Sequence, residues 1–349
     1  MINDNSYYIK KFDSLKSAVN NELNTYFEKK LKECSDDEIS QVINVLKDFT
    51  MNGGKRVRPI IMILGYNIFR DIDDKIIRAS TSIELAQSYL LIHDDIMDES
   101  DIRRGKPSFH KHFENKIKNR KIAENIAISA GDLIDTFSHE VLLKSGFNEK
   151  DLLNADYEFS KVIEDTGKGQ LLDLFSTINE TYSEEKLLKL HYFKTARYTI
   201  EGPMVMGSFL AGNYDYTQNI REFGKNAGIA FQLYDDILGM FGDEAKTGKS
   251  IKSDVNEGKK TLLIIKAYEN SNDLQRSFIE KCIKSGNVSD DDFNKLKKII
   301  IDTGSYDYSL KKIDEFTKIA KQNLKSIRGS EEPLEMLEFL SNYIINREN

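Results

Sequence analysis

Two aspartates one helical turn apart are the feature that most constrains this chain. The segment from His93 to Gly105 reads HDDIMDESDIRRG, and the residues before it, Ala79 to Leu91, contain few helix breakers. A helix that runs into this segment places Asp94 and Asp98 on one face, while Asp95 points about 100° around the axis. Two carboxylates stacked in this way repel each other unless a cation lies between them.

The cation that suits such a pair is Mg²⁺. This ion takes oxygen ligands, keeps several waters, and is commonly shared between one or two carboxylates and substrate phosphates. The alternative is a solvated acidic helix end, although acids at a helix C-terminus oppose the helix dipole. A second acidic pair, Asp235-Asp236, also follows an apolar helical stripe. This repetition favours metal binding over a solvated surface.

Composition indicates an all-α chain in a single domain that spans residues 1–349. Four prolines, no tryptophan and many Leu, Ile, Lys and Glu residues favour helices, and no Pro/Gly/Ser-rich linker divides the chain. The formal net charge of −7 argues against nucleic acid as the main partner. Apolar spacing predicts an amphipathic helix over 6–33, and Asp36-Asp37 caps a second one from Glu38 to Phe49. Further helices are predicted at 119–145, 149–178, 184–196, 197–211 and 216–241, with a helical scaffold over 260–346.

The sequence also bears on the compartment. The two cysteines, Cys34 and Cys282, fit neither a metal pattern nor a disulfide framework, which favours a reducing environment. The first twenty residues lack an apolar core, and no run of eighteen apolar residues occurs. We therefore expect no signal peptide, no transmembrane segment and a cytoplasmic location.

Cations cluster at several points along the chain. The stretch Gly53-Gly54-Lys55-Arg56-Val57-Arg58 is a turn whose glycines allow close approach of a ligand, with three cations within four residues. Arg103 and Arg104 follow the first acidic pair, and guanidinium forks match phosphate oxygens. Adjacent arginines point apart on a helix, so they suit two different anions. A loop rich in Gly and Lys, residues 246–261, follows the second pair. The combination suits two diphosphates held side by side.

These motifs resemble the trans-prenyltransferases, the short-chain polyprenyl diphosphate synthases. The match runs from GGKRVRP at 53–59 to GKKT at 258–261, and it includes DDIMD followed by RRG, GQLLD at 169–173, KT at 194–195 and FQLYDD at 231–236. The order and spacing of these motifs make the resemblance specific. It is strongest to geranylgeranyl diphosphate synthases.

The resemblance implies an isoprenoid-synthase-type helical bundle around a deep central cavity, with the two acidic motifs on facing walls. It implies three Mg²⁺ ions, with Mn²⁺ as a substitute: two bound by Asp94 and Asp98, a third by Asp235, and Asp95 and Asp236 supporting them. The positions that match binding of the allylic diphosphate are Arg103, Lys194, Thr195, Gln232, Lys249 and Lys259. Those that match binding of isopentenyl diphosphate are Gly54, Lys55, Arg58, Gln87 and Arg104. Gln170 and Asp173 match positions near the metal and its waters. The catalytic set implied is Asp94, Asp98, Arg103, Lys194, Asp235 and Lys249.

The chemistry implied is head-to-tail prenyl transfer through an allylic carbocation. Metal ions and fixed Lys/Arg donors stabilise the charge that develops on the leaving diphosphate, and an apolar, dry wall protects the cation. No side-chain nucleophile is required. His93, beside two aspartates, invites a zinc interpretation, but no second His or Cys lies at ligand spacing, so a structural role is expected.

One position departs from the family pattern. The second motif in many relatives ends in a third aspartate, where this chain has Gly239. Asp243 lies two turns beyond Asp235 and about 80° off its face, so it does not simply replace the missing residue. We expect Asp235 to carry the third metal ion nearly alone.

Product length depends, in the family, on bulk at the two positions four and five residues before the first motif. Leu90 lies directly below Asp94 on the helix face, and Tyr89 is rotated by about 140° from it. One aromatic at the earlier position, with no insertion in the motif, resembles geranylgeranyl diphosphate synthases. The alternative is that Tyr89 is an ordinary core aromatic. A farnesyl or bifunctional farnesyl/geranylgeranyl synthase is the second interpretation.

Other protein classes remain as alternatives. Terpene cyclases also carry DDxxD but need no site for a second diphosphate, which Lys55, Arg58 and Arg104 provide here. Head-to-head synthases such as squalene synthase lack the GGKR loop. A non-catalytic regulatory subunit of a prenyl synthase is disfavoured because both acid pairs are kept. The resemblance alone implies a homodimer.

Overall fold

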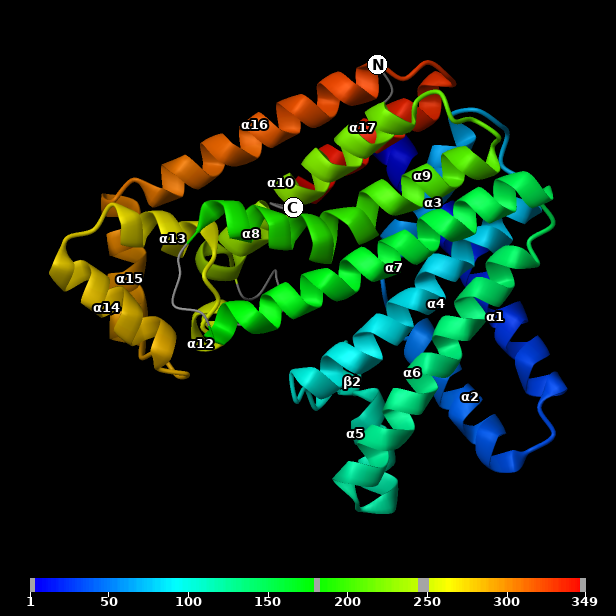
Figure 1. Ribbon diagram of the computed structural model, residues 1–349, viewed down its shortest axis with the longest axis horizontal. Coiled ribbons are helices and arrows are strands. Elements are labelled where there is room, and N and C mark those ends of the chain that lie inside the picture. Colours follow the sequence, from blue (N-terminus) through cyan, green and yellow to red (C-terminus); the bar gives the residue numbers. More distant parts are fainter. Residues whose placement is uncertain (1–3, 179–182, 244–250, 346–349) are drawn as a thin grey trace. The chain divides into compact units, whose positions relative to one another are not determined.

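The computed structural model describes residues 4–178, 183–243 and 251–345, and in these residues nearly all regular structure is helical (Figure 1). The predicted all-α class is confirmed. The chain divides into two compact units, here named unit 1 and unit 2. Unit 1 comprises residues 1–158, 203–214 and 329–336, and unit 2 comprises residues 159–202, 215–328 and 337–349. The prediction of a single functional domain stays a prediction.

Unit 1 carries the first acidic motif. Its elements are α1 (Asp4–Glu33), α2 (Asp37–Met51), α3 (Val57–Asn67), α4 (Asp74–Met97), β1 (Ile102–Arg103), β2 (Lys106–Pro107), α5 (Phe109–Ile117), α6 (Arg120–Leu143) and most of α9 (Gly202–Leu210). Within this unit, α4 packs most extensively against α6, and α3 also packs on α4. Helices α7 (Glu149–Ile178) and α17 (Glu331–Ile345) have residues in both units.

Unit 2 carries the second acidic motif. Its elements are α8 (Glu184–His191), the π-helix η1 (Tyr192–Glu201), α10 (Thr217–Phe241), α12 (Ser253–Asn256), α13 (Leu262–Glu269), α14 (Asp273–Lys284), α15 (Asp290–Asp302) and α16 (Ser305–Lys325). Helix α10 packs against α16 and η1. Its apolar stripe, with Ile229, Leu233 and Ile237, is buried in a core that includes residues of α13, α14 and α15. Burial of this stripe fixes the rotation of α10, and therefore the direction in which its acidic pair points.

Local signals predicted several helices well. Helices α1 and α2 match the predicted segments, and the carboxylate of Asp36 accepts a hydrogen bond from the Ile39 N–H at 2.9 Å, which confirms the predicted cap. Such a side chain satisfies one of the backbone donors that a helix N-terminus leaves unpaired. Helix α4 includes the predicted run into the first motif.

Two predictions about local structure were wrong. Arg103 and Arg104 were placed on a helix, but residues 102–107 form a two-stranded hairpin, and α5 follows it. The predicted break between 196 and 197 is also absent, because the chain is helical from α8 through η1 to α9. Pro203 follows Gly202, the C-terminal cap of η1, and because proline lacks an N–H and its ring crowds the carbonyl four residues earlier, it makes no ordinary helical bond to Thr199. The Gly202 N–H donates to the Arg197 carbonyl, five residues back.

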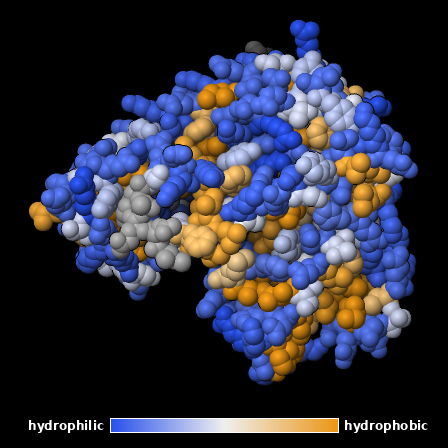
Figure 2. Space-filling model, in the orientation of Figure 1, coloured by the Kyte–Doolittle hydropathy of each residue, from blue (hydrophilic) through white to orange (hydrophobic). Residues whose placement is uncertain are grey.

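Hydrophilic residues cover most of the face seen in Figure 2, with smaller apolar patches between them. This distribution is typical of amphipathic helices that bury one side. Among the described helices, none combines the length and the apolar character that crossing a membrane requires.

Candidate active site

Helix α4 positions the first pair of aspartates. Asp94 is half-buried in the last turn, and Asp98 is the exposed C-terminal cap of the helix. The Asp98 N–H donates a hydrogen bond to the Asp94 carbonyl at 2.8 Å. The two residues are therefore one helical turn apart, as the sequence predicted.

Asp95 is fully buried and faces Arg103. Its Oδ1 accepts hydrogen bonds from Arg103 Nε at 2.7 Å and from Nη2 of the same residue, and this Nη2 lies 3.7 Å from Asp94 Oδ2. Burial raises the pKa of Asp95, and the hydrogen bond from Arg103 opposes that rise. The Oδ2 of Asp95 is buried with no hydrogen-bond partner in the described structure. Arg103 thus contacts both neighbouring aspartates, and the proposed metal role of Asp95 stays a prediction.

The hairpin separates Arg103 from Arg104. Arg104 and Gly105 form its two-residue turn, with φ of 52° and 74°. Such turns require positive φ at both central positions, a conformation that costs glycine little. Arg103 leaves the hairpin toward Asp95, whereas Arg104 Nη1 donates to the Asn52 carbonyl at 3.0 Å. The two arginines diverge as predicted, but because of a turn and not a helix.

Arg104 lies close to several other arginines, beside the Gly53-Gly54 turn. A Cβ added to Gly54 would meet Arg104 Nη1 at 3.0 Å. Burial lowers the pKa of Arg104; Glu84 opposes this, while Arg56, Arg103 and Arg58 lower it further. Of the other residues predicted to bind isopentenyl diphosphate, Lys55 is exposed, Arg58 is half-buried and Gln87 is buried. Like charges gathered at this density favour an anionic ligand.

Arg56 does not share this role. Its guanidinium is buried and pairs with the carboxylate of Glu84 through Nη1. Nε donates to Asn20 Oδ1 and Nη2 donates to the Thr50 carbonyl, both at 2.8 Å. Arg56 belongs to the cation cluster of the turn but not to the predicted ligand-binding set, and its donors serve the protein itself. Arg56 anchors the turn that carries Lys55 and Arg58.

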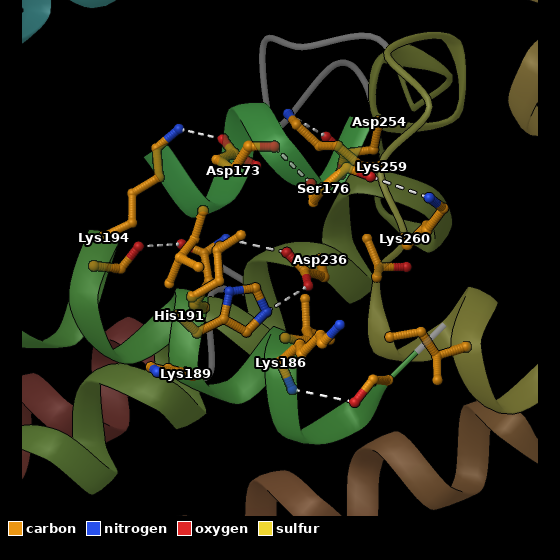
Figure 3. Close-up of a pocket in the computed structure, with 18 of the residues that line it drawn as sticks. Asp173, Ser176, Lys186, Lys189, His191, Lys194, Asp236, Asp254, Lys259 and Lys260 are labelled. Carbon is orange, nitrogen blue, oxygen red and sulfur yellow. Dashed lines mark hydrogen bonds and ion pairs between the residues drawn. The ribbon is translucent and has the colours of Figure 1, made fainter. Parts of the chain in front are cut away.

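The second acidic motif borders a cavity of about 470 Å³ in unit 2 (Figure 3). The cavity lies among residues of α7, α8, η1, α10 and the segment 254–265. It brings together seven residues that the sequence singled out: Asp173, Lys194, Thr195, Gln232, Asp235, Asp236 and Lys259. Lys249 lies outside the described residues. Residues from four separate motifs therefore meet at one cavity.

A chain of hydrogen bonds connects four residues that line this cavity. Thr195 Oγ1 donates to Gln232 Oε1 at 3.0 Å, and Gln232 Nε2 donates to Asp236 Oδ1 at 3.0 Å. His191 Nε2 lies 3.2 Å from Asp236 Oδ2. Both oxygens of Asp236 thus have protein partners, and its metal role stays a prediction. His191 carried no pattern in the sequence, because its partner lies forty-five residues away.

Each of two cavity lysines is held by a carboxylate. Lys194 donates to Asp173 Oδ2, and Lys259 Nζ lies 3.1 Å from Asp254 Oδ1 (Figure 3). Burial disfavours the charge of Lys259, but Asp254 and Glu257 more than compensate and raise its pKa. Asp254 was missed by the sequence analysis, since no spacing signal links it to the motif. Burial raises the pKa of Asp254, Lys259 opposes this rise, and the nearby Asp236 adds to it.

Within the described parts of the chain, no three His, Cys, Asp or Glu side chains converge as a metal site. Nε2 of His93 lies 3.2 Å from the Ile128 carbonyl and 3.8 Å from Asp132 Oδ1, and its structural role stays a prediction. The acidic motifs thus offer carboxylate oxygens in ones and twos, which suits an ion that also takes water and phosphate oxygens.

Comparison with known proteins gives consistent matches over most of the chain. A family model described as polyprenyl synthetase matches residues 39–300. The geranylgeranyl diphosphate synthase of Sulfolobus acidocaldarius is 28% identical over 346 residues, covering 98% of this chain and 99% of the relative. The geranylfarnesyl diphosphate synthase of Aeropyrum pernix is 31% identical over 304 residues, covering 84% of this chain and 91% of the relative. Among solved structures, the geranylgeranyl pyrophosphate synthase of Corynebacterium glutamicum, complexed with isoprenyl diphosphate and magnesium, matches with a TM-score of 0.88 at 27% identity, covering 97% of this chain and 99% of that one.

Proposed function

The chain belongs to the polyprenyl synthetase family, and from this membership we propose that it condenses isopentenyl diphosphate with an allylic diphosphate to give geranylgeranyl diphosphate. The observation that carries the proposal is the cavity of unit 2, where Lys194 and Lys259 lie with Asp235 and Asp236. Cations and carboxylates alternate there, an arrangement that suits a diphosphate bound partly through divalent metal.

The donor set fits Mg²⁺. The candidate ligands Asp94, Asp98 and Asp235 offer only oxygen atoms, the ligand type that Mg²⁺ takes together with phosphate oxygens and water. Mn²⁺ is the expected substitute, and three ions per site is the number that the resemblance implies. When bound, the ions neutralise charge on the leaving diphosphate.

The chain's own residues hold the substrates. Lys194 and Lys259 are positioned by Asp173 and Asp254, and a diphosphate competes with those carboxylates for the ammonium groups. As the allylic C–O bond breaks, its electron pair goes to the leaving diphosphate, where fixed cations stabilise it. The isopentenyl double bond then bonds to the allylic carbon, and a proton passes from the isopentenyl unit to the released diphosphate. The two substrates thus give two products, one longer prenyl diphosphate and one inorganic diphosphate.

A second diphosphate is expected in unit 1. Arg104, Arg58 and exposed Lys55 lie around the glycine turn, and the lowered pKa of Arg104 reflects burial and then crowding by other arginines. A bound isopentenyl diphosphate would relieve that crowding. The role of Gln87 in binding isopentenyl diphosphate rests on the resemblance. Its Oε1 is buried with no hydrogen-bond partner in the described structure.

The direct test is an assay with purified protein, isopentenyl diphosphate, Mg²⁺ and, in turn, dimethylallyl, geranyl or farnesyl diphosphate. We expect geranylgeranyl diphosphate, identified by mass spectrometry after dephosphorylation, and no product when the metal is chelated. A farnesyl or geranylfarnesyl product would correct the chain length only. Cyclic hydrocarbons would indicate a terpene cyclase, and no product with any primer would favour a non-catalytic subunit.

Tyr89 is the proposed stop for chain growth. Its ring packs edge-on against His93, with centroids 4.9 Å apart, and His93 in turn contacts α6 at Ile128. Burial, followed by Asp135 and Asp132 of α6, raises the pKa of Tyr89. The ring therefore lies on the side of α4 that faces α6, while Leu90 is half-buried below Asp94.

Tyr89→Ala is expected to lengthen the product by at least one isoprene unit, because it removes the ring that blocks the chain. Tyr89→Phe keeps the ring and is the matched control, for which we expect the wild-type product. The measurement is the chain-length distribution with farnesyl diphosphate as primer. An unchanged distribution in the alanine variant would assign Tyr89 to the core and leave the stop to another residue.

Two further expectations have different grounds: the homodimer rests on the resemblance alone, and the cytoplasmic location rests on the cysteine pattern and on the lack of an apolar leader or span in the sequence. We propose that the protein is a homodimer and that it acts in the cytoplasm. Light scattering on the purified protein tests the first, and a mass equal to that of one chain would exclude it. Fractionation of the source cells tests the second.

A further inference from the structure

The turn between α5 and α6 is strongly basic in a chain that is acidic overall. Residues 115–122 read NKIKNRKI, with four cations and no carboxylate, whereas the formal net charge of the whole chain is −7. Every residue of this segment is exposed. We name residues 115–122 the basic tip. In Figure 1 it lies at the bottom of the view, where α5 ends and α6 begins.

Three lysines of the basic tip have no carboxylate partner. Lys116, Lys118 and Lys121 form no ion pair within the described residues. Arg120 is different, since its Nε lies 2.8 Å from Glu124 Oε1. The positive charge of the three lysines is therefore not neutralised by an ion pair, and it attracts an anionic surface outside the protein.

The stability of the two helices does not explain these cations. Arg120 and Lys121 lie in the first turn of α6, where positive charge opposes the helix dipole and where no acid is present. Lys118 is the C-terminal cap of α5 with φ of 60°, a conformation that glycine adopts most readily. A role for these side chains outside the fold accounts for them better.

Two apolar side chains are exposed in the same segment. Ile117 at the end of α5 is 40% exposed, and Ile122 in the first turn of α6 is 47% exposed. Cations interleaved with apolar side chains are typical of surfaces that bind a bilayer, because the cations attract anionic headgroups and the apolar groups enter the acyl boundary. A nucleic acid backbone would be bound by the cations alone.

The basic tip lies next to the first acidic motif within unit 1. Arg120 Nη2 lies 3.8 Å from Glu99 Oε2, and Glu99 directly follows Asp98, the cap of α4. A surface bound by the basic tip would therefore lie at the end of α4 that carries the proposed metal ligands.

We propose that the basic tip is a docking surface for the anionic face of a lipid bilayer. Lys116, Lys118 and Lys121 attract the headgroups, and Ile117 and Ile122 enter the boundary between headgroups and acyl chains. The inference goes beyond the proposed function and does not rest on it. If the proposed function holds, the product would leave close to a bilayer, into which its long apolar chain partitions.

The test is binding of the purified full chain, without substrates, to vesicles of equal parts phosphatidylcholine and phosphatidylglycerol. Vesicles of phosphatidylcholine alone are the neutral comparison, and co-sedimentation gives the partition coefficient. We expect binding to the anionic vesicles only. Binding should be lost when the salt concentration rises from about 0.1 M to about 1 M, because the Debye length falls from about 10 Å to about 3 Å.

The triple variant Lys116→Gln, Lys118→Gln and Lys121→Gln tests the cations. Each cation near an anionic membrane strengthens binding about fivefold, so this variant should lose about 100-fold in the partition coefficient. Circular dichroism and thermal unfolding show whether it folds like the wild type.

A matched triple variant, Lys29→Gln, Lys32→Gln and Lys144→Gln, changes the net charge equally. These exposed lysines lie near the other end of α6, since Lys144 caps that end and Lys30 of α1 pairs with Glu140. Arg120 and Glu140 are about 30 Å apart at 1.5 Å per residue, beyond a Debye length. We therefore expect less than about a threefold change in vesicle binding.

The double variant Ile117→Ser and Ile122→Ser tests the apolar part. Burial of two half-exposed isoleucines in the bilayer predicts a loss of about tenfold or more in the partition coefficient when they are replaced. Ile117→Leu with Ile122→Leu keeps the apolar surface and should bind within about threefold of the wild type.

Four results would overturn the inference. They are no binding of the wild type to anionic vesicles, full binding by the triple variant of the basic tip, equal losses in the two triple variants, and full binding by the double serine variant. Binding to single-stranded RNA without binding to vesicles would assign the surface to nucleic acid instead. A change of mass in light scattering, confined to the triple variant of the basic tip, would assign it to a second copy of the chain. Failure of the proposed function would look different, because vesicle binding is measured without substrates.

Discussion

Replacing Asp94 with alanine is expected to lower kcat by at least about 10²- to 10³-fold, the range seen when one group that stabilises developing charge is lost. Asp94 lies in the last turn of α4 with Asp98 one turn beyond it, and Arg103 contacts Asp94 at 3.7 Å. Asp98→Ala should have a similar effect. Loss of either carboxylate removes a candidate Mg²⁺ ligand.

Steady-state kinetics with farnesyl and isopentenyl diphosphates at several Mg²⁺ concentrations measure this effect. Circular dichroism shows whether helix content is kept. Asp101→Asn is the matched control: this exposed aspartate lies in the same segment and pairs with Lys111 at 3.2 Å, outside the proposed ligand set. Near-normal turnover in either alanine variant would disprove the metal assignment. A comparable loss in the control would show that the kinetics report general disturbance of the segment.

The second large effect is on stability. Arg56→Ala should lower the free energy of unfolding by about 3–5 kcal/mol, the usual consequence of removing one partner of a buried ion pair. The side chains of Arg56 and Glu84 are 0% and 6% exposed, so the remaining carboxylate would be left buried without its counter-charge. The variant also leaves Asn20 Oδ1 and the Thr50 carbonyl without the donors they have now.

Chemical denaturation monitored by circular dichroism measures the change. Combining Arg56→Ala with Glu84→Gln removes the buried carboxylate that has lost its counter-charge. The double variant should therefore lose less free energy of unfolding than the two single variants lose together. Lys55→Ala is the control from the neighbouring position: Lys55 is exposed, and we expect unchanged stability but a raised KM for isopentenyl diphosphate. If Arg56→Ala lowered the free energy of unfolding by less than about 1 kcal/mol, the pair would contribute no more than an exposed surface ion pair, and the prediction would be wrong.

Local patterns were sufficient for much of this protein. The helical class, the bounds of α1 and α2, the Asp36 cap and the helix that delivers Asp94 follow from apolar periodicity and from capping residues. These signals act between residues a few positions apart, so the sequence carries them directly. The order of the acidic and cationic motifs likewise indicated the family. The predicted boundary at 196–197 was wrong because the chain stays helical there, as the π-helix η1.

What only the tertiary structure decided is which distant residues meet. Arg56 resembles its neighbours Lys55 and Arg58 in sequence, yet burial against Glu84 makes it structural. His191 reaches Asp236, and Asp254 fills the space beside Gly239, over separations that no helical period encodes. Apolar periodicity predicts which face of a helix is buried. Which residue a polar side chain contacts depends on how whole helices pack. For that reason the residue types of the site could be predicted from the sequence, whereas their division into ligand-binding, positioning and structural roles required the fold.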